Sequence, residues 1–396
     1  MSFDYGHKTP LYGSTIIGLK SAGVEFVRIQ WVDMTNTIRY RVVPIAYLEK
    51  LLDSPRPGVA IIKCALGIVY ITRADGFSPI GEYIYVIDMK TIRLCPYAPG
   101  HASVMGFFQE KAPIQGPDNQ PTVSTDLCPR TNLQRIADDA RDRAGVEFLV
   151  GFESEFILLK SNNTLEAVNT HGYGIKRALI SGSIEAQVME EIAHALNVAS
   201  IELQMYHSET ASGQYEFVTG PLPPLESADA LIHARETITN IAAKHGLRAT
   251  LAPRLYMDGH GVGAGGTYVS WGTENREAPV RLCNAASRSA CNFELRFVDG
   301  LANATPAVPC ARQHPRRRHP GRQAKQPLTH ADCSTLSAAD DAARKAAGIT
   351  TRMSLNLDES RKGLAGDAAL QAVLGEELVE KHLSLNKVVL AIAFLF

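Results

Sequence analysis

The sequence predicts an α+β protein in which a small, mainly β unit precedes a larger unit of alternating strands and helices. Between residues 14 and 110, short runs alternate apolar and polar side chains with the period of half-buried strands. A polar stretch containing Pro and Gly, 111–130, predicts a linker. From 131 to 396, segments of helical periodicity alternate with strand-like runs, which indicates a sheet backed by helices.

The first unit combines strand patterns with two helical patterns. Strand-like alternation occurs in VEFVRIQWVD, TIRYRVVPI, GIVYIT, YIYVID and ASVMGFF. Apolar residues recur at helical spacing in STIIGLKSA and IAYLEKLL. These patterns predict a mixed unit in which strands predominate.

The second unit begins with a predicted helix at 131–145, and a strand-like run at 147–159 follows it directly. A long helix is expected to begin at a cap on Ser227 and to end at Gly246. Further elements are a helix at 184–198 and strands at 199–209, 213–220 and 248–254.

Charge and cysteine usage narrow the class of protein. The 396 residues are 45% hydrophobic, and 40 basic residues balance 41 acidic ones, so nothing in the overall charge favours nucleic acid or an anionic membrane as partner. The 7 cysteines are scattered without C-x-x-C spacing, which indicates neither a disulfide framework nor a zinc site and favours a reducing, cytoplasmic location.

Two segments allow more than one interpretation. The apolar tail 388–396 is too short to span a bilayer as a helix, and it fits a strand or docking segment, a splicing or frame artefact, or an anchor. The basic stretch 310–327 has three prolines and no usable periodicity, so it cannot be a core element. It fits a nucleic-acid-binding loop, a solvated insertion or an altered reading frame.

The first constellation with chemical potential is GFESEF. Because side chains alternate along a strand, Glu153 and Glu155 project from the same face. Two carboxylates on one face of an apolar strand are tolerable if that face is wet or if a cation lies between them. The residues alone leave both possibilities open.

The second constellation is HSETASGQYE. Gly213 provides a bend between two short strands, which allows Glu209 and Glu216 to converge. Hard oxygen ligands from several strands suit Mg²⁺ or Mn²⁺ together with substrate phosphates. A single histidine is commonly a hydrogen-bonded structural residue, so His207 fits that role as well as a ligand role.

The third constellation joins arginines to another acid. Arg276 and Arg281 lie in NREAPVR, and Glu294 and Arg296 share one face of the strand FELRF. Arginine forks beside a metal-binding carboxylate suit anionic substrates or phosphate groups. A surface salt-bridge ladder would use the same residue types.

In this order, the three constellations resemble the motifs of glutamine synthetase and its fungal synthetase-like relatives. HSETASGQYEF matches the family pattern H-x-E-x-x-x-G-Q-x-E, and GFESEF and FELRF match two other metal-ligand strands. NREAPVR is similar to the segment whose arginines hold ATP phosphates. The resemblance covers the chain except for 259–264 and 304–327.

The resemblance implies a set of site residues. The implied ligands of Mg²⁺ or Mn²⁺ are Glu153, Glu155, Glu209, Glu216 and Glu294. It also implies that Arg276 takes part in catalysis, that Arg276 and Arg281 bind ATP, and that Arg296 binds the substrate. The implied reaction is phosphorylation of the γ-carboxylate of glutamate by ATP, followed by attack of ammonia or another amine to give an amide.

The resemblance further implies the domain organisation. Residues 14–110 would form a β-grasp domain, and residues 131–396 would form a catalytic domain with a curved antiparallel sheet backed by helices. In this family the active sites lie between subunits of ring-shaped homo-oligomers. We therefore expect a cytoplasmic homo-oligomer whose partners are glutamate and an amine, with no nucleic acid or membrane partner.

The sequence departs from the family pattern at three places. Only GHGVGA, 259–264, stands where the family has a Gly-rich strand with the pattern G-S-G-M-H-x-H, and His260 in this gap stays unassigned. Lys63–Gly67 offers no acid where the family binds ammonium, which favours a larger amine or none. The segment 302–306 begins like the family's A-N-P-x-L helix and then passes into the basic stretch.

The leading hypothesis is therefore an ATP- and metal-dependent carboxylate–amine ligase that acts on glutamate, with activity reduced if the missing segment is real. The rival hypothesis is a non-catalytic synthetase-like assembly or regulatory protein. A third is hydrolysis of an amide or amine substrate without nucleotide consumption. Metal-dependent ATP turnover distinguishes the first from the others.

Overall fold

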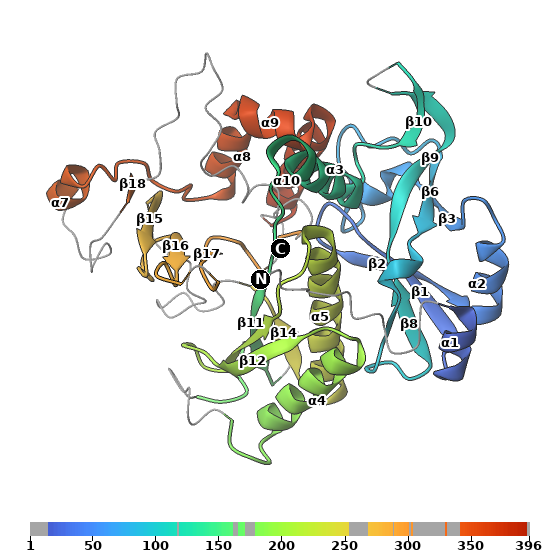
Figure 1. Cartoon of the computed structure of the whole chain (residues 1–396), viewed down its shortest axis with the longest axis horizontal. Helices are drawn as coiled ribbons and strands as arrows, with labels where there is room; N and C mark the ends of the chain where they lie inside the picture. Colours follow the sequence, from blue (N-terminus) through green and yellow to red (C-terminus); the bar gives the residue numbers. More distant parts are fainter. Residues whose placement is uncertain are drawn as a thin grey trace.

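The computed structural model describes most of the chain (Figure 1). Two segments that the sequence singles out, 259–264 and 304–327, lie outside the described residues. The described residues are 15–116, 119–160, 165–170, 179–252, 268–287, 289–300, 302–303, 329–330 and 341–393.

The first unit contains two four-stranded sheets around one apolar core. The first sheet has the order β2-β1-β8-β7, with β1 antiparallel to β2 and parallel to β8. Its strands are β1 Phe26–Val32, β2 Ile38–Pro44, β7 Arg93–Leu94 and β8 His101–Val104. The second sheet, β10-β9-β6-β3, comprises β3 Gly58–Ile62, β6 Glu82–Ile87, β9 Gly106–Gln115 and β10 Pro121–Ser124.

Short helices and one small hairpin complete this unit. The helices are α1 Ile16–Ser21, α2 Ile45–Leu52 and the 3₁₀ turns η1 Lys63–Gly67 and η2 Met89–Thr91. The hairpin pairs β4 Ile68–Val69 with β5 Thr72–Arg73. The stretch expected as a linker, 111–130, contains the end of β9, all of β10 and the start of helix α3, Pro129–Ala144, so much of it belongs to the second sheet.

The main sheet of the second unit has the order β12-β13-β11-β14 and is antiparallel throughout. Helices α4 and α5 pack on one of its faces, where alternate strand residues such as Phe156, Leu158 and Phe217 are buried (Figure 1). The opposite face is left for polar side chains. The elements are β11 Glu153–Leu159, α4 Ile184–Val198, β12 Leu203–Ser208, β13 Gln214–Thr219, α5 Pro224–Lys244 and β14 Arg248–Thr250.

A further sheet and the C-terminal helices follow. This sheet has the order β17-β16-β15-β18, and β16 and β17 form an antiparallel pair. Its strands are β15 Ser270–Thr273, β16 Val280–Cys283, β17 Asn292–Leu295 and β18 Thr329–His330. The helices are α7 Asp341–Ala346, α8 Leu357–Gly366, α9 Ala368–Leu374 and α10 Glu376–Ala393.

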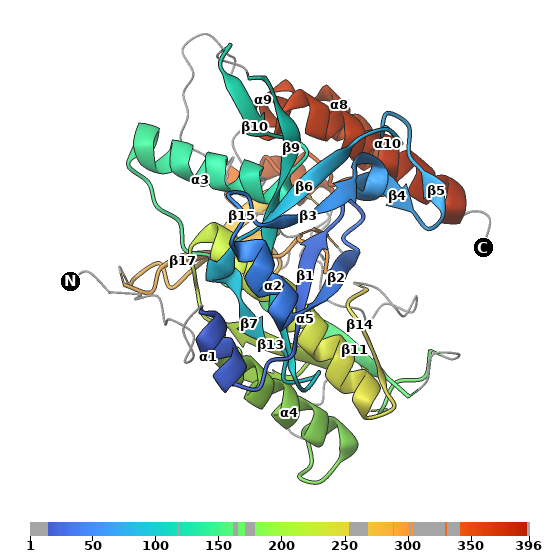
Figure 2. The same cartoon turned by 90° about the vertical axis from the view of Figure 1, so that its right-hand side faces the viewer.

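The last helix returns to the first unit. Leu378 and Leu385 of α10 are buried in the same core as the strands of the first unit, and α10 lies beside β4 and β5 in Figure 2. The Ser384 hydroxyl donates to the Asp75 carbonyl at 2.8 Å. Of the tail 388–396, the described part, 388–393, is helical and not a strand. Val388 and Val389 pack against the core of the first unit, which agrees with the alternative expectation of a docking segment.

Two other local expectations differ from the structure. The long helix α5 begins at Pro224, so Ser227 lies inside it, and the Ser227 hydroxyl donates to the Val150 carbonyl at 2.7 Å. Proline suits the first helical position because an N–H there would have no partner within the helix and because its fixed φ fits the helical backbone. The strand expected at 147–159 begins only at Glu153.

A buried ion-pair group joins the two units at helix α3, Pro129–Ala144. The Arg130 guanidinium contacts the Asp229 carboxylate of α5 at 2.7 Å and that of Asp88 at 3.2 Å. Burial opposes the charge of Arg130, but the charge of Asp229, its hydrogen bonds with Arg130 and the nearby Asp88 together raise the pKa of Arg130. Nearby, Arg93 donates to the Ala199 carbonyl at the end of α4 at 2.7 Å.

No helix in the described part of the chain combines the length and the apolar character needed to cross a bilayer.

Candidate functional site

Three neighbouring strands of the main sheet place ionisable side chains in one row on the face opposite α4 and α5. Glu216 of β13 lies directly across from Glu155 of β11 on one side and from His207 of β12 on the other. Glu153 and Glu209 lie two residues from members of this row, so the strand period puts Glu153 on the same face. We call Glu153, Glu155, Glu209 and Glu216 the carboxylate cluster.

The turn between β12 and β13 brings Glu209 back toward Glu216. Gly213 adopts a positive φ of 68°, and a Cβ there would lie 2.8 Å from the Leu158 carbonyl oxygen, so this position requires glycine. The Glu209 N–H donates to the Gln214 carbonyl at 2.8 Å and closes the turn. The glycine that the sequence marks as a bend therefore allows the two glutamates to converge.

The side chain of Gln214 holds the cluster in place. Its amide nitrogen donates to Glu155 Oε2 at 2.6 Å, and its amide oxygen accepts from the Ala211 N–H at 2.8 Å. Gln214 is buried, so both bonds are shielded from water. Sequence reasoning gave this residue no role, although the G-Q of the motif H-x-E-x-x-x-G-Q-x-E is the signal that could have identified it.

The crowded carboxylates resist ionisation. Desolvation, together with the negative charges of the neighbouring glutamates, raises the pKa of Glu216 to about 8. Desolvation and the charge of Glu209 raise the pKa of Glu155 to about 7, although the hydrogen bond from Gln214 opposes this. Desolvation and the charge of Glu294 raise the pKa of Glu153. A cation between these groups would relieve the repulsion.

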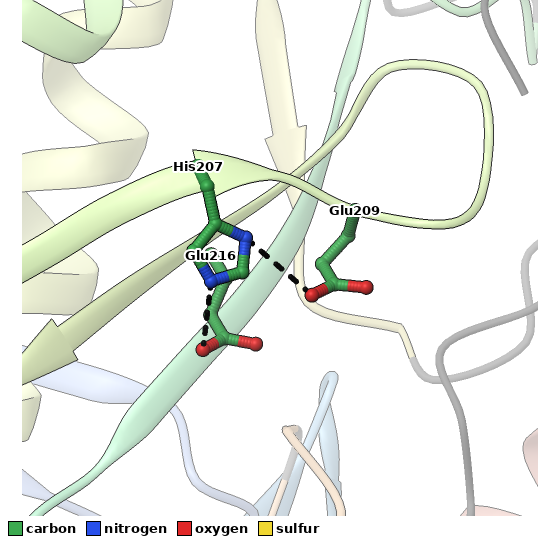
Figure 3. Close-up of side chains that lie close together, drawn as sticks. All are labelled: His207, Glu209 and Glu216. Atoms are coloured by element: carbon green, nitrogen blue, oxygen red, sulfur yellow. Dashed lines mark ion pairs between the residues drawn. The ribbon is translucent and has the colours of Figure 1, made fainter. Parts of the chain in front are cut away.

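His207 lies between two members of the cluster (Figure 3). Its Nδ1 is 3.5 Å from Glu209 Oε1, and its Nε2 is 3.6 Å from Glu216 Oε1. One nitrogen of His207 and one oxygen of each glutamate lie within 4.8 Å of one another. Within the described ranges, no other set of three histidine, cysteine or acidic residues brings its possible ligand atoms within this distance of one another.

The strands β16 and β17 form a hairpin in which Glu294 lies between two arginines. Arg281 contacts Glu294 Oε2 at 3.0 Å, and Arg296 contacts its Oε1 at 2.7 Å. Arg281 also contacts Glu274 at 3.1 Å. We call Arg281, Glu294 and Arg296 the arginine hairpin. In this group the negative charge of Glu294 is offset by the positive charges of the two arginines.

The arginine hairpin is close enough to the cluster to change its ionisation. The charges of Arg296 and Arg276 lower the pKa of Glu153, opposing desolvation, whereas that of Glu294 raises it. Arg276 itself is exposed, in the loop before β16. The structure therefore brings the residues singled out in the sequence into one electrostatic group.

This arrangement fits a divalent cation with a bound anion. The cluster supplies carboxylate oxygens, which Mg²⁺ and Mn²⁺ prefer. Desolvation and the charges of neighbouring glutamates raise the pKa values of Glu155 and Glu216, and a bound cation would offset both effects. Arginine forks bind phosphate or carboxylate groups in pairs of hydrogen bonds. For Arg281 and Arg296 to do so, an incoming anion must compete with Glu294.

Comparison with known families matches the chain to the catalytic domain of glutamine synthetase over residues 126–265 and 260–390. The two matched segments meet at 260–265, the region in which the sequence lacks the Gly-rich strand. The chain is 29% identical to the protein fluG of Emericella nidulans over 423 aligned positions. That alignment covers 92% of this chain and 46% of fluG, so the chain spans less than half of this relative.

A second relative and a solved structure cover nearly the full chain. The γ-glutamylpolyamine synthetase GlnA3 of Streptomyces coelicolor is 25% identical, with 91% of this chain and 89% of GlnA3 covered. The structure of GmaS in complex with ADP superposes with a TM-score of 0.74 at 16% identity, covering 96% of each chain. At this identity the structural likeness shows a shared fold.

Proposed function

The chain belongs to the glutamine synthetase family, and from this premise we propose that it is an ATP- and divalent-metal-dependent ligase that joins the γ-carboxylate of glutamate to ammonia or a larger amine. The observation that carries the proposal is the carboxylate cluster, with Glu216 and Glu155 facing each other across β13 and β11. Five glutamates and three arginines gather in one electrostatic group there.

The proposed metal ligands are the carboxylate cluster and Glu294. A bound Mg²⁺ or Mn²⁺ would offset the charge of the polyphosphate and of the transferred phosphoryl group. Gln214 fixes the orientation of the Glu155 carboxylate through its 2.6 Å hydrogen bond, so this ligand is preorganised. The excess negative charge of the cluster supports cation binding.

The proposed roles of the arginines concern anions. Arg276 and Arg281 would hold the phosphates of ATP, Arg276 acting directly in catalysis, and Arg296 would hold a carboxylate of glutamate. Transfer of the γ-phosphoryl group to the γ-carboxylate releases ADP, and attack of the amine on the acyl carbon then releases phosphate and a proton. Release of Glu294 by the two arginines would accompany ATP and glutamate binding.

Features of the first unit support the proposal that the amine substrate is larger than ammonium. The segment Lys63–Gly67 forms η1, with Cys64 and Leu66 buried, and it contains no acid. The nearby Glu110 is neutralised by Lys63, whose Nζ lies 2.7 Å from both carboxylate oxygens. Similarity to a γ-glutamylpolyamine synthetase also supports a larger amine substrate.

We further propose a ring-shaped homo-oligomer in which this unit, 14–110, closes the site of a neighbouring subunit.

A non-catalytic synthetase-like assembly or regulatory role is the second candidate. The observation that favours it is that Glu294 forms ion pairs with both Arg281 and Arg296. The short segment 259–264, which stands where the family has its Gly-rich strand, adds to this.

Release of ADP by the purified full chain tests the proposal. The assay contains glutamate, Mg²⁺ or Mn²⁺, and ammonium, hydroxylamine or a polyamine, and amide products are identified by mass spectrometry. Glu216→Ala removes a cluster carboxylate, and Glu190→Gln on the exposed side of α4 serves as matched control. We expect ADP release that requires both metal and glutamate, that falls at least about 100-fold in Glu216→Ala and that is unchanged in Glu190→Gln.

Absence of ADP release from folded, oligomeric chain with every amine would overturn the ligase proposal and support the non-catalytic role. Product formation without ADP would instead indicate hydrolytic chemistry. A clear preference for polyamine over ammonium would identify the amine class.

A further inference from the structure

His207 occupies a position in the carboxylate cluster that the family motif alone does not explain. It lies on β12 directly across from Glu216, and Figure 3 shows its ring between the carboxylates of Glu209 and Glu216. The side chain is 31% exposed, so a hydrated cation can reach it from solvent. The ring nitrogens therefore lie among the carboxylates and are also accessible to a cation from solvent.

The backbone selects which ring nitrogen is available. Nδ1 lies 3.2 Å from the Ser208 carbonyl oxygen. A carbonyl oxygen only accepts, so this contact places the imidazole proton on Nδ1 and leaves the lone pair on Nε2. Histidines that bind metals commonly donate their second ring N–H to such a carbonyl, which fixes the tautomer and the ring orientation. Nε2 is the nitrogen that faces Glu216.

The contacts of His207 with the glutamates are too long for hydrogen bonds. Nε2 is 3.6 Å from Glu216 Oε1 and Nδ1 is 3.5 Å from Glu209 Oε1, whereas N–H···O bonds fall at about 2.7–3.2 Å. Two ligand atoms that each lie about 2.1 Å from one cation are separated by roughly 3.0–3.5 Å. Because Nδ1 carries the proton, only the separation between Nε2 and Glu216 Oε1 bears on ligation, and it is close to the spacing of neighbouring ligands on a shared metal ion.

We propose that His207 Nε2 is a ligand of the divalent cation held by Glu216 and Glu209. This inference rests on the proposed metal site and adds a nitrogen donor to it. The family's histidine-bearing strand is absent from this sequence, where 259–264 stands in its place, so His207 provides the site with an imidazole ligand from another element. The ion would be bound by a mixed nitrogen and oxygen set.

The nitrogen donor has a consequence for metal choice. Mg²⁺ strongly prefers oxygen ligands, whereas imidazole suits the transition metals, whose affinities rise from Mn²⁺ toward Zn²⁺. Loss of the imidazole therefore weakens Mn²⁺ binding far more than Mg²⁺ binding. The ratio of the two affinities reports on His207 without any enzymatic turnover.

The experiment uses the full chain, stripped of metal with a chelator and free of nucleotide. Mn²⁺ is titrated by electron paramagnetic resonance, Mg²⁺ by competition, and nitrogen ligation is read from ¹⁴N electron spin echo modulation of bound Mn²⁺. His207→Gln keeps a polar side chain of similar reach, and His194→Gln on the exposed side of α4 is the matched control. Circular dichroism confirms that each variant is folded.

We expect ¹⁴N modulation in the wild type and in His194→Gln, and its loss in His207→Gln. In His207→Gln the dissociation constant for Mn²⁺ should rise at least about 10-fold, and that for Mg²⁺ should change less than about 3-fold. Persistent ¹⁴N modulation in His207→Gln, or an equal loss of both metals, would overturn the assignment.

The same titration separates this inference from the proposed function. If the wild-type chain binds neither metal, both the metal site and the His207 assignment fail. If it binds Mn²⁺ in a manner that requires Glu216 but not His207, the metal site stands and the His207 assignment alone is wrong.

Discussion

At the junction of the two units, Arg130 lies between two aspartates, whereas on the main sheet four glutamates lie together. Arg130 is 2.7 Å from Asp229 and 3.2 Å from Asp88, and both Arg130 and Asp229 are buried. No lysine or arginine in the described segments forms an ion pair with a member of the carboxylate cluster. The first group is complete within the chain, and the second has an excess of negative charge.

This difference separates a structural role from a ligand-binding role. Buried charges that satisfy one another hold elements together, because removing one partner leaves the other uncompensated. Crowded like charges destabilise a fold unless something else binds them, so they indicate a ligand. The arginine hairpin is intermediate, since Glu294 is balanced internally in the absence of an anion.

The largest expected effect concerns the junction. Arg130→Met should lower the free energy of unfolding by about 3–5 kcal/mol, because it leaves Asp229 buried without a cation. Urea denaturation measures the change, and Arg143→Met, which removes an exposed ion pair on the same helix, should change it by less than about 1 kcal/mol. Equal effects of the two variants would show that the junction charges have no special structural role.

A second effect concerns His233, a buried residue of α5 near the same junction. Burial and the charge of Arg93 lower the pKa of His233 from 6.5 to about 3. Below pH 6.5 the unfolded chain therefore binds a proton that the folded chain does not, so stability falls as pH decreases toward 3. From pH 6 to 4.5 this contribution should be roughly 2 kcal/mol.

The matched variant for this pH dependence is His233→Asn, whose side-chain amide can still form a hydrogen bond with the Ser103 hydroxyl. It should be less stable than the wild type at pH 7, but its free energy of unfolding should fall less steeply on acidification. His194→Asn, on the exposed side of α4, should keep the wild-type slope. Identical slopes for the wild type and His233→Asn would contradict the assignment.

A smaller effect is expected in the arginine hairpin. Glu294→Gln removes two ion pairs whose members are 15–21% exposed, so the free energy of unfolding should fall by about 1–2 kcal/mol. Glu82→Gln, which removes an exposed pair with Lys111, is the control and should change it by less than about 0.5 kcal/mol. If Glu294→Gln instead raised the free energy of unfolding, the charge of Glu294 would be repelled by its surroundings, as in the carboxylate cluster, and not balanced by the two arginines.

The smallest expected effect is a stabilisation, unlike the losses of stability predicted above. In chelator at pH 8, Glu155→Gln should raise the free energy of unfolding by about 0.5–1 kcal/mol, because it removes one charge from a crowded group and keeps an acceptor for Gln214. Adding Mn²⁺ should stabilise the wild type more than this variant. Destabilisation in chelator would show that the cluster is not strained by its own charge.

Much of the local structure could be predicted from the sequence. Helix α2 was expected as IAYLEKLL and spans Ile45–Leu52, and α4 was expected at 184–198 and spans Ile184–Val198. The misplaced cap at Ser227 and the strand expected in the tail each have a physical cause. A serine hydroxyl can bond to a distant carbonyl instead of its own helix, and a short apolar run fits a strand or a buried helix equally well.

The candidate site could be predicted in its residues but not in its contacts. The alternation of β11 places Glu153 and Glu155 on one face without any tertiary information. The sequence could not show that Gln214 would donate to Glu155, or that Arg281 and Arg296 would both contact Glu294. These contacts depend on strand register and on how two sheets pack.

By itself, the sequence determined the fold class, the family and the set of acidic and basic residues, because side-chain periodicity and motif spacing are local properties. Only the tertiary structure decided that β11, β12 and β13 align His207, Glu216 and Glu155 in one row. It also decided that the last helix packs into the core of the first unit. Such long-range pairings are fixed by packing and register, which join residues far apart in the chain.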